Sequence, residues 1–195
     1  MKLENELFYC ENILAHHDNL QLIQTFRVIK ETGLGLEYYL KKAAVSDEIN
    51  HQARTYLVKE KGTNDLVGYF SLKAGTVATK VRKTFLHLEM DSIPAIELAN
   101  FAVNDNYKMA HDEQHGLGEM IFYYFVLPMC QHASEYIGID MIYIFALPYK
   151  NLINYYERMH FRRLPKTIEN IIHHYHKPRY DEGCIFMSRP LHVEE

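Results

Sequence analysis

The order of apolar and polar positions divides the first half of the chain into two parts. Residues 1–50 have a mainly helical pattern, clearest over residues 36–44, where apolar positions recur at helical spacing after two glycines. Residues 54–59 and 66–72 are instead rich in β-branched and aromatic residues, and the Gly-Thr-Asn-Asp sequence between them favours a turn. The pattern therefore predicts a helical N-terminal segment followed by an antiparallel hairpin.

The second half alternates between strands and helices. Residues 93–103 have the alternation of a strand, and residues 139–146 form the nearly continuous apolar run of a central strand covered on both faces. A long apolar helix is predicted from Gly116 to about residue 136, a short helix over 151–159 and a closing strand over 183–188. This order predicts an α/β protein with a mixed, twisted sheet flanked by helices.

No repeat, low-complexity tract or flexible linker divides the 195 residues, so we predict a single domain over residues 1–195. The longest apolar stretch, residues 120–130, is about half the length of a membrane-spanning helix and contains a proline. The N-terminal residues do not have the charged start followed by an apolar stretch that is typical of a secretory signal. Three widely spaced cysteines do not suggest a disulfide framework. We therefore expect a cytoplasmic protein with no membrane partner.

The formal net charge of −4 argues against a surface built mainly for nucleic acid. Short basic clusters at residues 80–83 and 158–166 are read as solvated surface, although either could contact phosphate. Twelve histidines are present, but no cysteine or carboxylate cluster completes a tetrahedral metal site with them. We therefore expect no metal, and we expect Cys130, inside the apolar helix, to be a packed thiol.

The informative element is the turn Gly116-Leu117-Gly118, which opens the long helix after the strand over 93–103. The start of a helix leaves about four backbone N–H groups without intrahelical partners and carries the positive end of the helix dipole. Glycines allow a phosphate oxygen to approach the backbone closely. The turn is therefore a candidate site for the pyrophosphate of a large cofactor.

This arrangement resembles the GNAT acetyltransferases, most strongly over residues 93–161 and more broadly over residues 35–190, with residues 1–34 as a helical extension. The pyrophosphate loop of that family reads Gln/Arg-x-x-Gly-x-Gly/Ala, and Gly116 and Gly118 match its two small positions. Glu113 departs from the first position, and Gln114 follows it. The resemblance implies that acetyl-CoA is the cosubstrate and that its pyrophosphate is bound by Gln114, His115, Gly116, Leu117, Gly118 and Glu119.

Two further segments carry the resemblance. Residues 156–161 are similar to the Tyr-Glu-x-x-Gly-Phe segment of the family, with His160 where glycine is usual. The resemblance implies that Tyr156 protonates the departing CoA thiolate and that Asn151 contacts the pantetheine arm. A phenol with an ordinary pKa near 10 keeps its proton at neutral pH.

The strand over 93–103 resembles the fourth strand of the family. Alternation places Ile96, Leu98, Asn100 and Ala102 on one face and Glu97, Ala99, Phe101 and Val103 on the other. The resemblance implies that Glu97 is the general base for an ammonium substrate, since apolar neighbours make a carboxylate a better base. It also implies that the main chain of Phe101, Ala102 and Val103 pairs with the pantetheine arm and polarises the thioester.

We therefore predict direct acetyl transfer from acetyl-CoA to a primary amine of a small molecule or a protein. Residues 36–44, 54–58 and 68–72 also look like the toxin-type branch of the family, whose members acetylate aminoacyl-tRNA. That alternative makes tRNA a partner, and the acidic balance and Glu97 weigh against it. A non-catalytic acyl-CoA sensor is a third hypothesis, and the many tyrosines and phenylalanines make a homodimer plausible.

Overall fold

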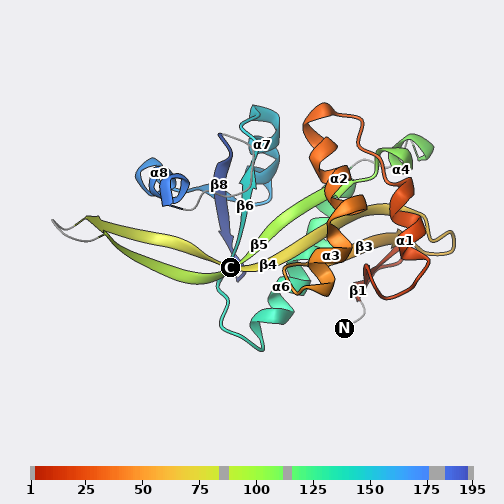
Figure 1. Ribbon diagram of the computed structural model, residues 1–195, viewed down its shortest axis with the longest axis horizontal. Helices are drawn as coiled ribbons and strands as arrows, with labels where there is room; N and C mark the ends of the chain where they lie inside the picture. The colour runs from red at the N-terminus through yellow and green to blue at the C-terminus, as the bar shows by residue number, and fades with distance from the viewer. Residues whose placement is uncertain (1–2, 84–87, 112–115, 176–182, 193–195) are drawn as a thin grey trace. The chain divides into compact units, whose positions relative to one another are not determined.

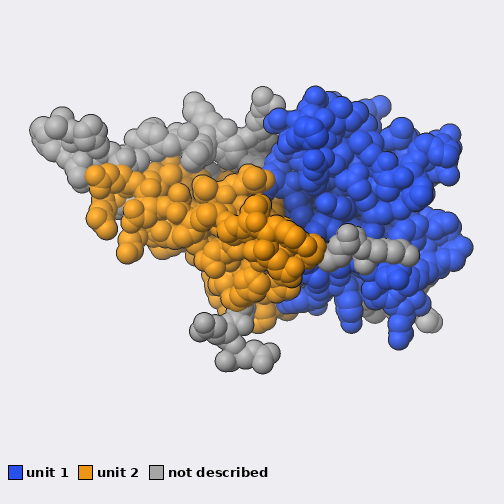
Figure 2. Space-filling model, turned by 90° about the horizontal axis from the view of Figure 1, so that it is seen from below, with its two compact units in different colours: residues 1–73, 98–129 blue, residues 74–97, 130–195 orange. Residues whose placement is uncertain are grey.

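The computed structural model describes residues 3–83, 88–111, 116–175 and 183–192. The chain forms two compact units, shown in different colours in Figure 2. Unit 1 contains residues 1–73 and 98–129, and unit 2 contains residues 74–97 and 130–195. No helix among the described residues is both long and apolar enough to cross a bilayer.

The strands are hydrogen bonded in the order β1-β2-β3-β4-β5-β6-β8-β7 (Figure 1). Their bounds are β1 Leu3–Glu4, β2 Phe8–Asn12, β3 Arg54–Glu60, β4 Leu66–Lys83, β5 Leu88–Val103, β6 Met141–Ala146, β7 Arg162–Arg163 and β8 Ile185–Pro190. The β5–β6 ladder is parallel, whereas the ladders from β1 to β4 and from β6 through β8 to β7 are antiparallel. The sheet is therefore mixed, as the sequence predicts.

The α-helices are α1 Asn19–Leu22, α2 Leu34–Lys42, α3 Ala44–Ile49, α4 Asp105–Ala110, α5 Leu117–Ile121, α6 Leu127–Ser134, α7 Lys150–Arg158 and α8 Lys166–Tyr175. Two 3-10 turns cover Ile23–Thr25 and Glu31–Gly33. The predicted hairpin over residues 54–72 is confirmed, with Tyr56 paired to Phe70. The predicted strands over 93–103, 139–146 and 183–188 correspond to β5, β6 and β8.

The prediction that the N-terminal segment is helical is wrong for its first part. Residues 8–12 form β2, which pairs with β1 and with β3. This strand is held by a partner distant in sequence, because the buried Nζ of Lys59 on β3 donates to Oε1 of Glu11 at 2.5 Å. A five-residue strand near the edge of the sheet has too short a pattern to separate it from helix, and its pairing decides its conformation.

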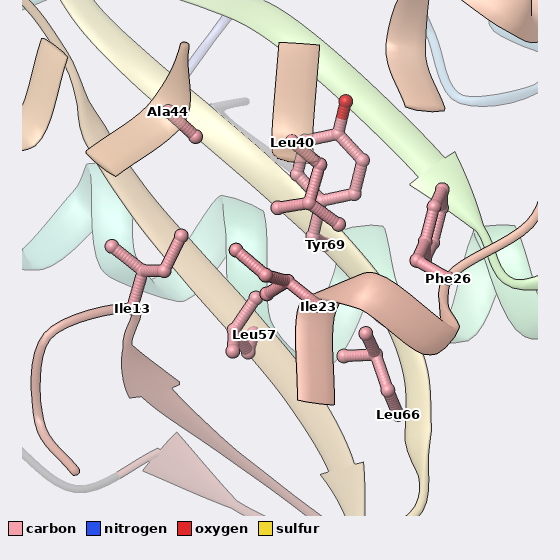
Figure 3. Close-up of a cluster of buried hydrophobic side chains, with 8 residues drawn as sticks. All are labelled: Ile13, Ile23, Phe26, Leu40, Ala44, Leu57, Leu66 and Tyr69. Carbon is pink, nitrogen blue, oxygen red and sulfur yellow. The ribbon is translucent and has the colours of Figure 1, made fainter. Parts of the chain in front are cut away.

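The core of unit 1 lies between α1, α2, α3 and the sheet (Figure 3). Its fully buried side chains come from segments far apart in the sequence: Ile13, Ile23, Phe26, Leu40, Ala44, Leu57, Leu66 and Tyr69. The ring of Tyr69 packs edge-to-face against Phe26 at 5.2 Å, and its hydroxyl donates to the carbonyl of Leu36 at 2.6 Å. This bond satisfies the polar end of a large buried aromatic side chain.

The long apolar helix begins at Leu117, as predicted, but one turn of it is wider than an α-helical turn. Residues 122–126 form a π turn, in which the N–H of Leu127 donates to the carbonyl of Phe122. Pro128 follows directly. Because proline has no N–H and its ring clashes with the carbonyl four residues earlier, the regular α-helical pattern cannot pass through this position. The wider turn accommodates the proline, and α6 continues to Ser134.

Unit 2 has a second core between α8 and the sheet. It contains Val77, Ala78, Ala95, Tyr143, Ile168, Ile172 and Phe186. The rings of Tyr143 and Phe186 stack with centroids 5.0 Å apart and planes 11° apart. Since Tyr143 also takes part in the β5–β6 ladder, this core fixes a tyrosine beside β5.

Candidate active site

Tyr156 lies on the buried side of α7. Its side chain is 9% exposed, and its ring packs edge-to-face on Phe161 with centroids 5.6 Å apart. Burial raises the pKa of the Tyr156 phenol well above its ordinary value. The hydroxyl therefore keeps its proton throughout the neutral range, which is the state a proton donor requires.

The backbone conformation at the end of α7 explains why glycine is usual at position 160 in the Tyr-Glu-x-x-Gly-Phe segment. His160 has a φ of 65°, in the left-handed region that favours glycine. The N–H of His160 donates to the carbonyl of Glu157, and the N–H of Phe161 donates to the carbonyl of Tyr156. These two bonds form a Schellman motif, with histidine at the left-handed position. His160 thus departs from the pattern in residue type and keeps the backbone conformation.

Glu97 lies on β5 at the point where this strand pairs with β6. The parallel ladder joins Ala95 to Met141 and Glu97 to Tyr143. The Glu97 side chain is 8% exposed, and its Oε2 accepts a hydrogen bond from the Tyr143 hydroxyl at 3.3 Å. The structure therefore places this carboxylate in a largely buried, hydrogen-bonded environment.

The predicted pyrophosphate turn begins at an exposed glycine. Gly116 has a φ of 76° and is the N-cap of α5, and its carbonyl accepts from the N–H of Met120 at 2.9 Å. A Cβ at Gly116 would have open space around it, so the left-handed backbone is the reason for glycine here. Leu117 anchors the turn in the core, and Gly118 and Glu119 are half-buried. The predicted contacts Gln114 and His115, and the departure at Glu113, lie outside the described residues.

The remaining predicted cofactor contacts lie on β5 and α7. Phe101, Ala102 and Val103 are half-buried at the end of β5. Here β4 approaches closely, because a Cβ on Gly68 would lie 2.7 Å from the carbonyl oxygen of Ala102. Asn151 is exposed in the first turn of α7. Glu97, Asn151 and Tyr156 belong to unit 2, whereas Phe101, Ala102, Val103 and the turn at Gly116 belong to unit 1.

Sequence reasoning missed Tyr143, which is hydrogen bonded to Glu97, and Gly75, which lies against Tyr143. Tyr143 stood only in an apolar run, and Gly75 only in the unassigned stretch after the hairpin. The signal for Tyr143 was a hydroxyl within a run expected to be buried, because such a group needs a partner.

A cavity of about 730 Å³ on unit 1, between β1, β2 and the turn at Lys61 and Gly62, was also missed, and it contains none of the predicted site residues.

Within the described parts of the chain, no three His, Cys, Asp or Glu side chains are grouped so that they could hold a metal ion. His173 and His174 lie in α8, and His176 and His115 are outside the described residues. Nδ1 of His111 donates to the carbonyl of Tyr107 at 3.0 Å. All three cysteines are buried free thiols.

No protein-family model matches the sequence. Solved structures do resemble this one. A tyrosine-to-phenylalanine variant of KacT has a TM-score of 0.67 at 18% identity, over 95% of this chain and 96% of that chain. A tyrosine-to-phenylalanine variant of the toxin AtaT, bound to the C-terminus of the antitoxin AtaR and acetyl-CoA, has a TM-score of 0.64 at 16% identity, over 94% and 93% of the two chains. AtaT complexed with acetyl-methionyl-tRNAfMet has a TM-score of 0.63 at 16% identity, over 92% and 93%.

The chain has the GNAT fold. The predicted fold class is thereby confirmed, including the mixed sheet with flanking helices.

Proposed function

We propose that this protein transfers the acetyl group of acetyl-CoA to the α-amino group of an aminoacyl-tRNA. The observation that carries the proposal is the likeness, over more than nine-tenths of both chains, to AtaT in complexes with acetyl-CoA and with acetyl-methionyl-tRNAfMet. The toxin-type alternative is thus better supported than a small-molecule or protein acceptor.

The acidic balance of the chain is a weaker objection to tRNA than it first appeared. Unit 2 contains equal numbers of basic and acidic residues, so the whole net charge of −4 comes from unit 1. Beyond Tyr156 on the chain, unit 2 exposes a run of cations: Arg158, Arg162, Arg163 and Lys166. All four side chains are exposed to solvent, and Glu169 lies 3.4 Å from Arg163 and partly neutralises it.

The residues present fit acetyl-CoA. The turn at Gly116 offers an exposed glycine at the start of a helical run that continues to Ser134. We assign the pyrophosphate to the backbone amides of this turn, with Gln114 and His115 beside them, because helix N-termini bind anions. We assign the pantetheine arm to the main chain of residues 101–103 and to Asn151. When bound, acetyl-CoA supplies an activated thioester.

The side chains then have two complementary tasks. Glu97 removes a proton from the ammonium form of the acceptor, and the freed amine forms the new C–N bond as the C–S bond breaks. Tyr156 donates its proton to the departing sulfur, and the second proton that the nitrogen releases as the amide forms restores the phenol. Main-chain N–H groups of β5 polarise the carbonyl and stabilise the negative charge on its oxygen. A covalent acyl-enzyme is not required, which agrees with three buried thiols.

The proposal is tested with purified protein, acetyl-CoA labelled in the acetyl group, and a panel of acceptors. Charged tRNAs, the same tRNAs without amino acid, polyamines and peptides are compared. We expect the label on the amino acid of charged tRNA, and none on uncharged tRNA. Labelling of polyamines or peptides alone would instead support the small-amine or protein reaction, and CoA binding without transfer to any acceptor would support the sensor.

A cellular assay adds a second criterion. Expression of the protein should arrest growth, and Tyr156→Phe should relieve the arrest. AtaT occurs with the C-terminus of the antitoxin AtaR, and KacT occurs in a KacTA–DNA complex. We therefore also expect an antitoxin protein that binds this chain and restores growth when both are expressed. The homodimer stays a prediction for the free protein.

A further inference from the structure

Residues of unit 2 on three neighbouring strands meet around one hydroxyl group. Tyr143 on β6 donates to Oε2 of Glu97 on β5 at 3.3 Å. On β4, an added Cβ at Gly75 would lie 2.1 Å from the Tyr143 hydroxyl oxygen and 2.8 Å from Cζ. The φ of Gly75 is not in the left-handed region, so space and not backbone conformation requires glycine here. The tyrosine thus reaches over β5 to the backbone of β4.

We propose that Tyr143 is a positioning residue that holds the carboxylate of Glu97 in place for proton removal, and that Gly75 leaves the room this requires. The inference rests on the proposed role of Glu97 as the general base. Tyr143 acts through Glu97, so it is not itself a catalytic residue.

The ring of Tyr143 is fixed well enough for this task. It stacks on Phe186 with centroids 5.0 Å apart and meets Phe145 edge-to-face at 6.0 Å. The side chain is 6% exposed, so the hydroxyl has few positions open to it. Burial, followed by the nearby Glu97 carboxylate, raises the pKa of the Tyr143 phenol, which therefore stays a hydrogen-bond donor at all pH values at which the enzyme would work.

Several polar groups on the described parts of the elements around this pair have partners of their own. On β8, the register partner of Tyr143 is Ser188, and on β7 the partner of Ser188 is Arg162, which donates to the carbonyls of Glu157 and Phe161. On α8, Glu169 accepts from the N–H of Phe186 and from Arg163. On β4, the facing position is Gly75. The Tyr143 hydroxyl is thus a buried hydrogen-bond donor to Glu97 from the neighbouring strand.

The test is the pH profile of kcat/KM for acetyl transfer in Tyr143→Phe. The tyrosine hydroxyl favours the charged carboxylate, so its removal should move the acid limb of the profile to higher pH by about one unit. The matched control is Tyr69→Phe, which also removes a buried hydroxyl with a hydrogen bond, in this case to Leu36. Its pH profile should stay that of the wild type, whatever its stability.

Gly75→Ala is a second, independent variant that tests whether Tyr143 needs the space at Gly75. The new methyl group would meet the Tyr143 hydroxyl, so the single variant should shift the profile in the same direction. The ring carbons Cζ and Cε1 lie 2.8 and 2.9 Å from the added methyl group, so Tyr143→Phe would not relieve the clash and the single variant Gly75→Ala is the informative one. A wild-type acid limb in Tyr143→Phe overturns the proposed role of Tyr143, and a wild-type acid limb in Gly75→Ala overturns the proposed role of Gly75.

Failure of this inference is distinguishable from failure of the proposed function. If the wild type transfers no acetyl group to charged tRNA or to any amine, the proposed function is wrong. If the wild type is active and Glu97→Gln loses the acid limb, while Tyr143→Phe keeps the limb at the wild-type pH, Glu97 is the base and Tyr143 does not position it. If Glu97→Gln itself keeps the wild-type profile, both roles are wrong although the transferase remains.

Discussion

The ring of Tyr156 packs edge-to-face on Phe161, 5.6 Å away, and the carbonyl of Tyr156 accepts the N–H of the same Phe161 at 3.1 Å. The residue that closes the end of α7 is thus also the one that covers the proposed proton donor. Tyr156 is fixed both through its backbone and through its ring, and its burial raises the pKa of the phenol.

Tyr156→Phe should lower kcat by roughly 10²- to 10⁴-fold, the usual contribution of a general acid, with little change in acetyl-CoA affinity. Because the raised pKa keeps the phenol protonated, the wild-type rate should not fall through loss of this proton between pH 7 and about 10. Tyr155→Phe is the matched control, since Tyr155 is adjacent and half-buried. Steady-state kinetics measure kcat, and calorimetry measures the affinity for acetyl-CoA. A large loss of affinity with a normal kcat would contradict the role of Tyr156 as the acid.

Gly118→Asp should abolish acetyl-CoA binding, because a carboxylate in the first turn of α5 would repel the pyrophosphate. An acidic residue at a helix N-terminus stabilises the helix, so the loss should not reflect unfolding. Gly138→Asp serves as control, because Gly138 is exposed and an added Cβ there meets no atom within 4 Å. Titration calorimetry with CoA gives the answer, and an unaltered binding heat in Gly118→Asp would place the pyrophosphate elsewhere.

His160→Gly should stabilise the protein by roughly 0.5–1 kcal/mol, because a left-handed backbone is unfavourable for a residue with a Cβ and is freely adopted by glycine. His132→Gly, inside α6, should destabilise it by a similar amount. Urea unfolding midpoints measure both effects. A lower midpoint for His160→Gly would show that the histidine side chain contributes more than the backbone conformation costs.

The cysteines should be unreactive in the folded protein. Burial raises the pKa of Cys130 to about 12 and raises that of Cys10 as well, so the reactive thiolate is scarce at pH 8. Cys184 is buried too. A chromogenic thiol reagent should therefore label native protein slowly at pH 8 and all three cysteines at once after denaturation. Rapid labelling of Cys130 in the native state would contradict its assignment as a packed thiol.

The sequence determined those features that depend on neighbouring residues. The Gly-Thr-Asn-Asp turn predicted the hairpin of β3 and β4, alternation predicted β5, and the glycines at 116 and 118 predicted the start of α5. The resemblance to the family segment identified position 160 as one where glycine is usual, and the left-handed backbone of His160 gives the physical reason. Turn formation, strand alternation and helix termination act over a few residues, so a short stretch of sequence contains them.

Tertiary structure alone decided which distant residues meet. The parallel ladder of β5 and β6 brings Tyr143 to Glu97 across 46 positions, and the close approach of β4 makes Gly75 part of the same group. In the same way, pairing with β3 made a strand of residues 8–12, which by pattern alone had been assigned to a helix. Each contact depends on strand order and register, which are set by the packing of the whole sheet and not by the residues adjacent to each partner.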